Sequence, residues 1–124
     1  VPPVSGSPRV VAAPAGASDR AAATRTAVSW VTAWARPTLA PAPWRAGLRS
    51  STYDDYLRRL GSVDPRNVPA TRVAGTATVT RFLTGVAHVR VPVAGGAARA
   101  VEVTVIYYPR THAGRWLVND VTRI

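Results

Sequence analysis

The spacing of apolar residues changes at Asp64-Pro65, from a helical period before it to strand-like alternation after it. Between residues 18 and 35 the apolar positions recur about every 3.6 residues, which predicts one buried helical face. That face consists of Ala23, Ala27, Trp30, Val31 and Trp34. We expect a helix that has Ser18 or Asp19 as its N-cap and that ends before Pro37.

Two further helical segments are expected before the change of pattern. The stretch that begins Pro43-Trp44 predicts a short helical turn with Pro43 at its first position and with Trp44 and Leu48 on its inner side. Thr52-Tyr53-Asp54-Asp55 approximates a capping box and predicts a helix that ends near Gly61. Its apolar side is formed by Tyr53, Tyr56, Leu57 and Leu60.

After Asp64-Pro65 the chain alternates apolar and polar residues in four runs, which predict strands over 71–83, 86–93, 99–108 and 116–124. The alternation in the first run fails at Arg81, which predicts a bulge near Thr80. Helices followed by antiparallel strands define an α+β domain. We therefore expect N-terminal helices packed on a curved four-stranded antiparallel sheet over residues 18–124, preceded by a flexible Pro/Ala/Gly linker over residues 1–17.

Composition narrows the class of protein. The 124 residues suit one domain, and no apolar run approaches the ~20 residues of a membrane helix. The absence of Cys excludes disulfides and thiolate metal sites. There is no Met, so we expect a fragment or a processed product. The part missing before residue 1 is expected to be an N-terminal membrane anchor, which would then be the only contact with a membrane. The alternative is that residues 1–17 are an ordinary interdomain linker.

The net charge of +10 permits binding to nucleic acid or to another anionic polymer. All sixteen basic residues are Arg, and they are spread from Arg9 to Arg123 without a basic block. This distribution favours a solvated cationic surface, and electrostatic binding of DNA or anionic polymer stays as an alternative.

Asp120 is the acid with a catalytic interpretation. Strict alternation from Trp116 and Val118 would point Asp120 into the core, where burial raises the pKa of a carboxyl group. A bulge at Asn119-Asp120 would instead turn Val121 inward and expose Asp120, and the cost of burying an unpaired carboxylate favours that arrangement. If Asp120 does point inward, Tyr107 is the candidate donor beside it.

Other polar and aromatic residues indicate binding rather than catalysis. His88 and His112 are far apart and have no acidic companion at ligand spacing, so no metal site and no cofactor are predicted. Ile106 and Tyr108 alternate with core positions and are expected on the outward face of the sheet, as is Arg90. We take these three residues as candidates for contact with a partner.

Several of these segments together resemble the nuclear transport factor 2-like superfamily, a cystatin-like α+β cone, over about residues 19 to 124. They are the helix bearing two Trp, the turn Pro43-Trp44-x-x-Gly47-Leu48, the Tyr-rich helix and the ending Gly114-x-Trp116-x-Val118. The Pro-Trp turn and Asp64-Pro65-x-Asn67-Val68-Pro69 also resemble small membrane-tethered proteins of GC-rich bacteria that are linked to conjugative elements. Enzymatic members often carry an extra hairpin among the helices, and no strand is predicted before Thr71.

The resemblance implies a non-enzymatic, extracytoplasmic protein-interaction or assembly module of a conjugative transfer or envelope complex, membrane-anchored in its full-length form. Protein partners or self-association are the expected contacts, through the outward face that bears Ile106 and Tyr108 or through the open mouth of the cone, and a cytoplasmic location stays open. The alternative is a small enzyme of the isomerase or dehydratase kind that uses Asp120 with Tyr107.

Overall fold

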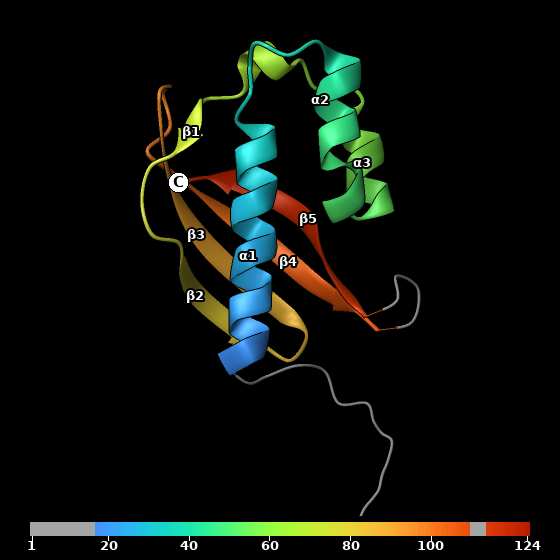
Figure 1. The fold of residues 1–124 in the computed structure, drawn as a ribbon, viewed down its shortest axis with the longest axis vertical. Helices are drawn as coiled ribbons and strands as arrows, with labels where there is room; N and C mark the ends of the chain where they lie inside the picture. Colours follow the sequence, from blue (N-terminus) through green and yellow to red (C-terminus); the bar gives the residue numbers. More distant parts are fainter. Residues whose placement is uncertain (1–16, 110–113) are drawn as a thin grey trace, which may run out of the picture.

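An antiparallel sheet and a layer of helices make up the described residues, 17–109 and 114–124, of a computed structural model (Figure 1). The linker prediction lies outside the described residues except for Ala17, and so does His112. The helices come first in the chain and the strands follow, so the α+β class is confirmed.

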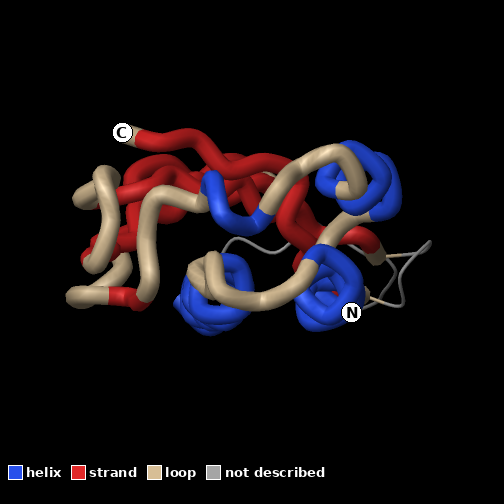
Figure 2. The backbone as a smooth tube through the Cα atoms, turned by 90° about the horizontal axis from the view of Figure 1, so that it is seen from above, coloured by secondary structure: helices blue, strands red, loops and turns tan. Residues whose placement is uncertain are grey.

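Helix α1 (Ala17–Trp34) lies over one face of the sheet, here called the inner face (Figures 1 and 2). Helix α2 (Pro41–Leu48) lies beside α1, and α3 (Asp54–Leu60) lies beside the last strand. The predicted apolar stripe of α1 is confirmed, because its members range from 0% to 6% exposed. Burial of this stripe attaches α1 to the sheet.

The strands are β1 (Arg72–Val73), β2 (Thr78–Leu83), β3 (Val86–Ala94), β4 (Ala100–Tyr108) and β5 (Arg115–Arg123). Their order is β1-β3-β4-β5, with β2 also paired to β3, and every pairing is antiparallel. The predicted bulge near Thr80 is confirmed by a register shift between Val79 and Arg81.

The prediction of a single first strand over 71–83 is wrong. Pairing with β3 stops after Val73 and resumes at Thr78, so the first strand is split into β1 and β2. The interruption lies opposite Pro92, which has no N–H to donate to a neighbouring strand. Pro92 still accepts a 2.8 Å hydrogen bond from the Ala74 N–H, after which the chain leaves the ladder.

Predictions about the starts of the helices are also wrong. Ser18 and Asp19 lie inside α1, and α2 begins at Pro41 rather than Pro43. Tyr53, not Thr52, occupies the N-cap position of α3. Thr52 is 2% exposed and bonds to Trp30, a residue too distant in sequence for a local pattern to reveal.

Candidate partner-binding surface

Aromatic side chains fill the inner face of the sheet. The rings of Trp30 and Trp34 stack with centroids 5.8 Å apart, and Tyr56 of α3 stacks on Trp30 with centroids 6.1 Å apart. Trp44 and Leu48, on α2, are both 0% exposed. The buried indole N–H of Trp44 donates to the Trp34 carbonyl at 2.9 Å, so that polar group is satisfied. This side of the sheet is therefore packed as a core.

The structure separates the two candidate catalytic residues. A register shift in β5 pairs Val118 with Val105 and Asp120 with Thr104, so Asn119 is the bulged residue. Asp120 is exposed, while Val121 packs against the core. Tyr107 is half-buried on the inner face, with its ring 5.5 Å from that of Trp116. The bulge thus directs Asp120 to solvent, away from the side of the sheet that holds Tyr107.

Among the described residues, Tyr56 is the titratable side chain whose surroundings shift its pKa furthest from the ordinary value. Its side chain is buried at 8% exposure, and burial is the main cause that raises the pKa of Tyr56 to about 12. The negative charge of Asp120 also raises this pKa, whereas the Val121 N–H and Arg59 lower it. The guanidinium carbon of Arg59 lies 5.0 Å from the centre of the Tyr56 ring. Because the ring packs among core residues, we assign Tyr56 to the fold rather than to catalysis.

The opposite, outer face of the sheet carries apolar side chains in a line across four strands. Leu83 pairs with Val86, Val86 with Ile106, and Ile106 with Leu117. We call these four residues the outer apolar row. Leu83 is 51% exposed, Val86 and Ile106 are half-buried, and Leu117 is buried at 2%. The row therefore passes from a covered end at β5 to an open end at β2.

Tyr108 extends this apolar surface, and a ring contact and a hydrogen bond help to hold it in place. Its ring stacks on that of Tyr53, with centroids 4.6 Å apart and 6° between planes. Its hydroxyl donates to Asn119 Oδ1 at 2.9 Å. Tyr53 reaches this position because its N–H donates to the Val118 carbonyl, which attaches the start of α3 to the edge of β5. Burial, followed by the charges of neighbouring groups, raises the pKa of Tyr108.

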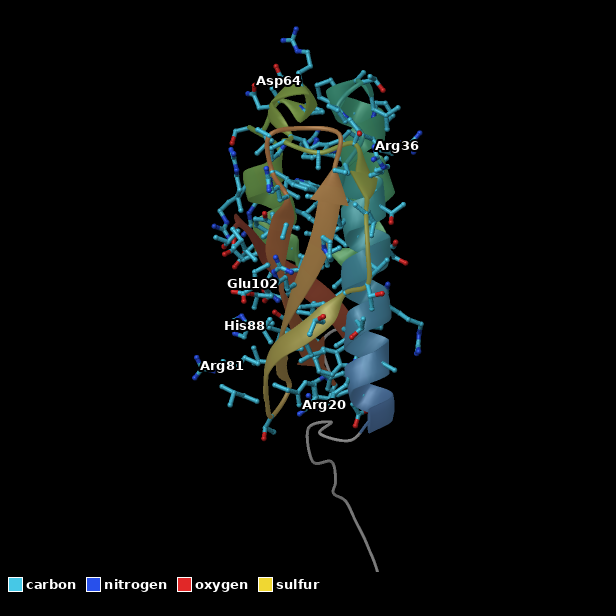
Figure 3. All side chains as sticks on the ribbon, turned by 90° about the vertical axis from the view of Figure 1, so that its left-hand side faces the viewer. Arg20, Arg36, Asp64, Arg81, His88 and Glu102 are labelled. Carbon is cyan, nitrogen blue, oxygen red and sulfur yellow. The ribbon has the colours of Figure 1, made fainter. Side chains whose placement is uncertain are left out.

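Next to the row, polar side chains form a cluster on the same face (Figure 3). Glu102 accepts a 3.0 Å hydrogen bond from Thr80 and lies 3.8 Å from Nδ1 of His88. Thr104 Oγ1 is 3.3 Å from the same His88 nitrogen. Arg90 pairs with Glu102 across the strands and is exposed. The outer face thus combines an apolar row with a polar, hydrogen-bonded border.

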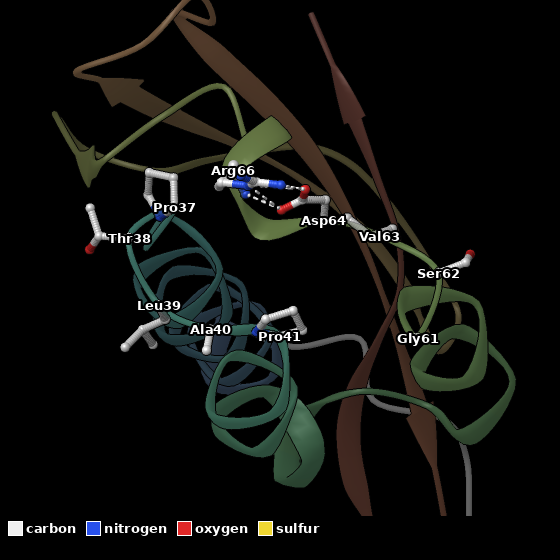
Figure 4. A pocket seen from close by; sticks show the side chains of 10 residues that line it. All are labelled: Pro37, Thr38, Leu39, Ala40, Pro41, Gly61, Ser62, Val63, Asp64 and Arg66. Atoms are coloured by element: carbon white, nitrogen blue, oxygen red, sulfur yellow. Dashed lines mark hydrogen bonds and ion pairs between the residues drawn. The ribbon is translucent and has the colours of Figure 1, made fainter.

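A wide-mouthed depression of about 770 Å³ lies at the end of the molecule where the loops between helices meet (Figure 4). One side is formed by residues 37–41 and the other by residues 61–64 and Arg66. Asp64 and Arg66 form an ion pair at its rim, with 2.8 Å between Nη2 and Oδ2, and this pairing lowers the pKa of Asp64. Because the two charged groups neutralise each other, the depression offers a ligand mainly loop backbone, apolar side chains and the hydroxyls of Thr38 and Ser62.

Of the sequence candidates, Ile106, Tyr108 and Arg90 lie together on the outer face, and Asp120 shares that face. Leu83, Val86 and Leu117 were missed. The two residues between Leu83 and Val86 form a tight turn, and a turn of that length places its flanking residues opposite each other. The two-residue spacing could therefore have predicted the Leu83–Val86 pair from the sequence.

No helix within residues 17–109 or 114–124 combines the length and the apolar character needed to cross a bilayer. The same residues contain no group of three or more His, Asp or Glu side chains arranged to hold a metal ion. Comparison with known proteins finds no matching family model, no matching curated protein and no matching solved structure.

Proposed function

We propose that this protein is a non-enzymatic protein-interaction module that binds its partner through the outer face of the sheet. The single observation that carries the proposal is the outer apolar row, which crosses four strands on the side of the sheet that α1 does not cover. The inner face already supplies the core. A second apolar surface on a small domain is typical of a protein contact.

The chemistry of the outer face indicates the kind of partner. Arg81 and Arg90 are exposed on the same face as the row, and the chain as a whole carries a net charge of +10. Apolar side chains bordered by carboxylates would complement this surface, since opposite potentials across an interface favour encounter and register. We therefore propose an acidic protein partner with an apolar centre.

We further propose a nuclear transport factor 2-like cone as the fold. The order of the elements, with helices before an antiparallel meander, supports it. The ending Gly114-x-Trp116-x-Val118 supports it too, because Trp116 and Val118 are 8% and 0% exposed and face the core. The likeness of the Pro-Trp turn to membrane-tethered proteins of conjugative elements supports an envelope location and a role in conjugative transfer. Fractionation of cells that produce the full-length protein tests that location.

The interaction is tested by purifying the full-length protein with its native complex and measuring the mass by light scattering after nuclease treatment. We expect a stoichiometric complex with a second protein that persists as salt is raised. Electrostatic binding of DNA would instead weaken steeply with salt, since each neutralised phosphate adds to the slope. A mass equal to the chain alone, or to copies of the chain only, would contradict a protein partner.

A further inference from the structure

A second surface feature, independent of the outer face, lies between α1, the segment that leads into α3, and the start of β5. It is an open depression of about 410 Å³. Its lining is Arg25, Thr26, Ser29, Ser51, Arg115 and Trp116. All six side chains carry hydrogen-bond donors, and none is a carboxylate. We propose that this depression binds the phosphate group of a small ligand.

Two guanidinium groups at the depression favour an anionic ligand. Arg25 belongs to α1 and Arg115 to β5, and both are exposed at the same depression. Arg115 also donates to the Ser50 carbonyl, which holds its side chain toward the depression and leaves further N–H groups of the guanidinium for a ligand. Two like charges brought together repel each other, and an anion between them removes that cost. Arginine is also the residue that best matches the geometry of phosphate.

The indole of Trp116 is the second argument. Trp116 is 8% exposed, and its N–H donates to no group among residues 17–109 and 114–124. By contrast, Trp30 donates to Thr52 and Trp44 donates to the Trp34 carbonyl. An indole N–H that no described residue accepts, in the wall of an open depression, is free to donate to an oxygen of a ligand. A phosphate oxygen would be such an acceptor.

The hydroxyl groups of α1 are the third argument. Thr24 and Thr32 each donate to the carbonyl four residues earlier, at 2.7 Å in both cases. Thr26 and Ser29, which line the depression on the same helix, make no such bond within the described residues. Their hydroxyls are therefore available to a ligand, and with the guanidinium groups and the indole they form a set of donors from α1 and β5 around one depression.

The proposal is tested by titrating the full chain with inorganic phosphate while recording the indole N–H resonance of Trp116, assigned by its loss in Trp116→Phe. Sodium chloride holds the ionic strength constant. We expect a saturable shift of that resonance. Arg25→Gln and Arg115→Gln should each weaken binding about tenfold, since each removes a charge-assisted hydrogen bond.

Arg99→Gln is the matched control, because Arg99 is also exposed but lies at the opposite end of β4. Arg99 directly precedes Ala100, the first residue of β4, whereas Arg115 pairs with Tyr108, the last residue of β4. It should leave the affinity within about twofold. Tighter binding of glycerol 3-phosphate than of inorganic phosphate would assign a phosphorylated small molecule, and equal affinity would assign free phosphate. The proposal fails if phosphate moves the Trp116 resonance no more than chloride does, or if Arg99→Gln weakens binding as much as Arg25→Gln.

Discussion

The indole N–H of Trp30 donates to the hydroxyl oxygen of Thr52 at 2.7 Å, although the two residues are 22 positions apart. The same hydroxyl donates to the Leu48 carbonyl at 2.6 Å. Thr52 thus satisfies a buried donor of α1 and a carbonyl at the end of α2 at the same time. Its neighbour Tyr53 bonds to the edge of β5, so this short segment connects both helices to the sheet.

Thr52→Val should lower the free energy of unfolding by about 1–3 kcal/mol, because it leaves the buried Trp30 N–H without its acceptor and removes the hydroxyl bond to the Leu48 carbonyl. Valine has nearly the same shape as threonine, so lost packing contributes little. Thr32→Val is the matched control, since the Thr32 hydroxyl bonds to the Val28 carbonyl at an exposed position. That variant should change stability by no more than about 0.5 kcal/mol. Urea unfolding measures both, and equal losses would refute the role given to Thr52.

Tyr56 should make the fold sensitive to alkaline pH. Its pKa is about 12 in the folded protein against 10.0 for an ordinary tyrosine, so the folded state retains the proton over a range where the unfolded state loses it. The resulting stabilisation is complete below pH 10, declines as the pH rises from there, and is lost once the pH passes the folded pKa. Two pKa units correspond to about 3 kcal/mol.

Unfolding in urea at several pH values, for the native chain and for Tyr56→Phe, measures this contribution. The native chain should lose more stability between about pH 9 and pH 12 than the variant does. Asp120→Asn should lower the pKa of Tyr56, because it removes a negative charge that raises it, and an ultraviolet titration of tyrosinate detects the change. Parallel stability curves for the native chain and Tyr56→Phe would contradict the assignment.

Two glycines should respond in opposite directions to the same substitution. A Cβ at Gly47 in α2 meets nothing within 4 Å, so Gly47→Ala should stabilise the protein by about 0.5–1 kcal/mol through the higher helix propensity of alanine. A Cβ at Gly96 would lie 2.3 Å from the Pro69 carbonyl oxygen, which is backbone and has little room to move. Gly96→Ala should therefore destabilise by more than about 1 kcal/mol. Thermal unfolding of the two variants is the measurement, and a gain in stability from Gly96→Ala would contradict the close approach of Gly96 to the Pro69 backbone.

The features that could be predicted from the sequence are those that depend on local periodicity. The stripe of α1 follows from its 3.6-residue repeat, and the bulges near Thr80 and Asn119 follow from breaks in a two-residue alternation. The exposure of Asp120 follows from the second of these breaks together with the cost of burying a carboxylate. In each case the evidence lies within a few residues of the feature.

The features that could not be predicted depend on partners distant in sequence. Thr52 forms a local capping pattern, yet the acceptor requirement of Trp30 determines its position. The break between β1 and β2 is caused by Pro92, which lies on a different strand. Similarly, the outward position of Ile106 follows from alternation, but the continuous row from Leu83 to Leu117 exists only once the register of four strands is known.

Binding through the outer face should be sensitive to charge at the open end of the row. Leu83 is 51% exposed, so Leu83→Arg adds a charge there without disturbing the core. Thr122→Arg is the matched control, because Thr122 is exposed on the same face and pairs with Glu102, away from the row. The first variant should weaken the complex at least about tenfold, as expected for a residue inside an interface, and the second should change it little.

The most direct measurement places a photocrosslinking amino acid at Val86, in the middle of the row, in the full-length protein within its native cells. We predict a crosslink from Val86 to an acidic protein, none from the same probe at Ser29 on α1, and loss of the Val86 crosslink in Leu83→Arg but not in Thr122→Arg. No crosslink from Val86, or equal crosslinking in the two arginine variants, would contradict the outer face as the partner-binding surface.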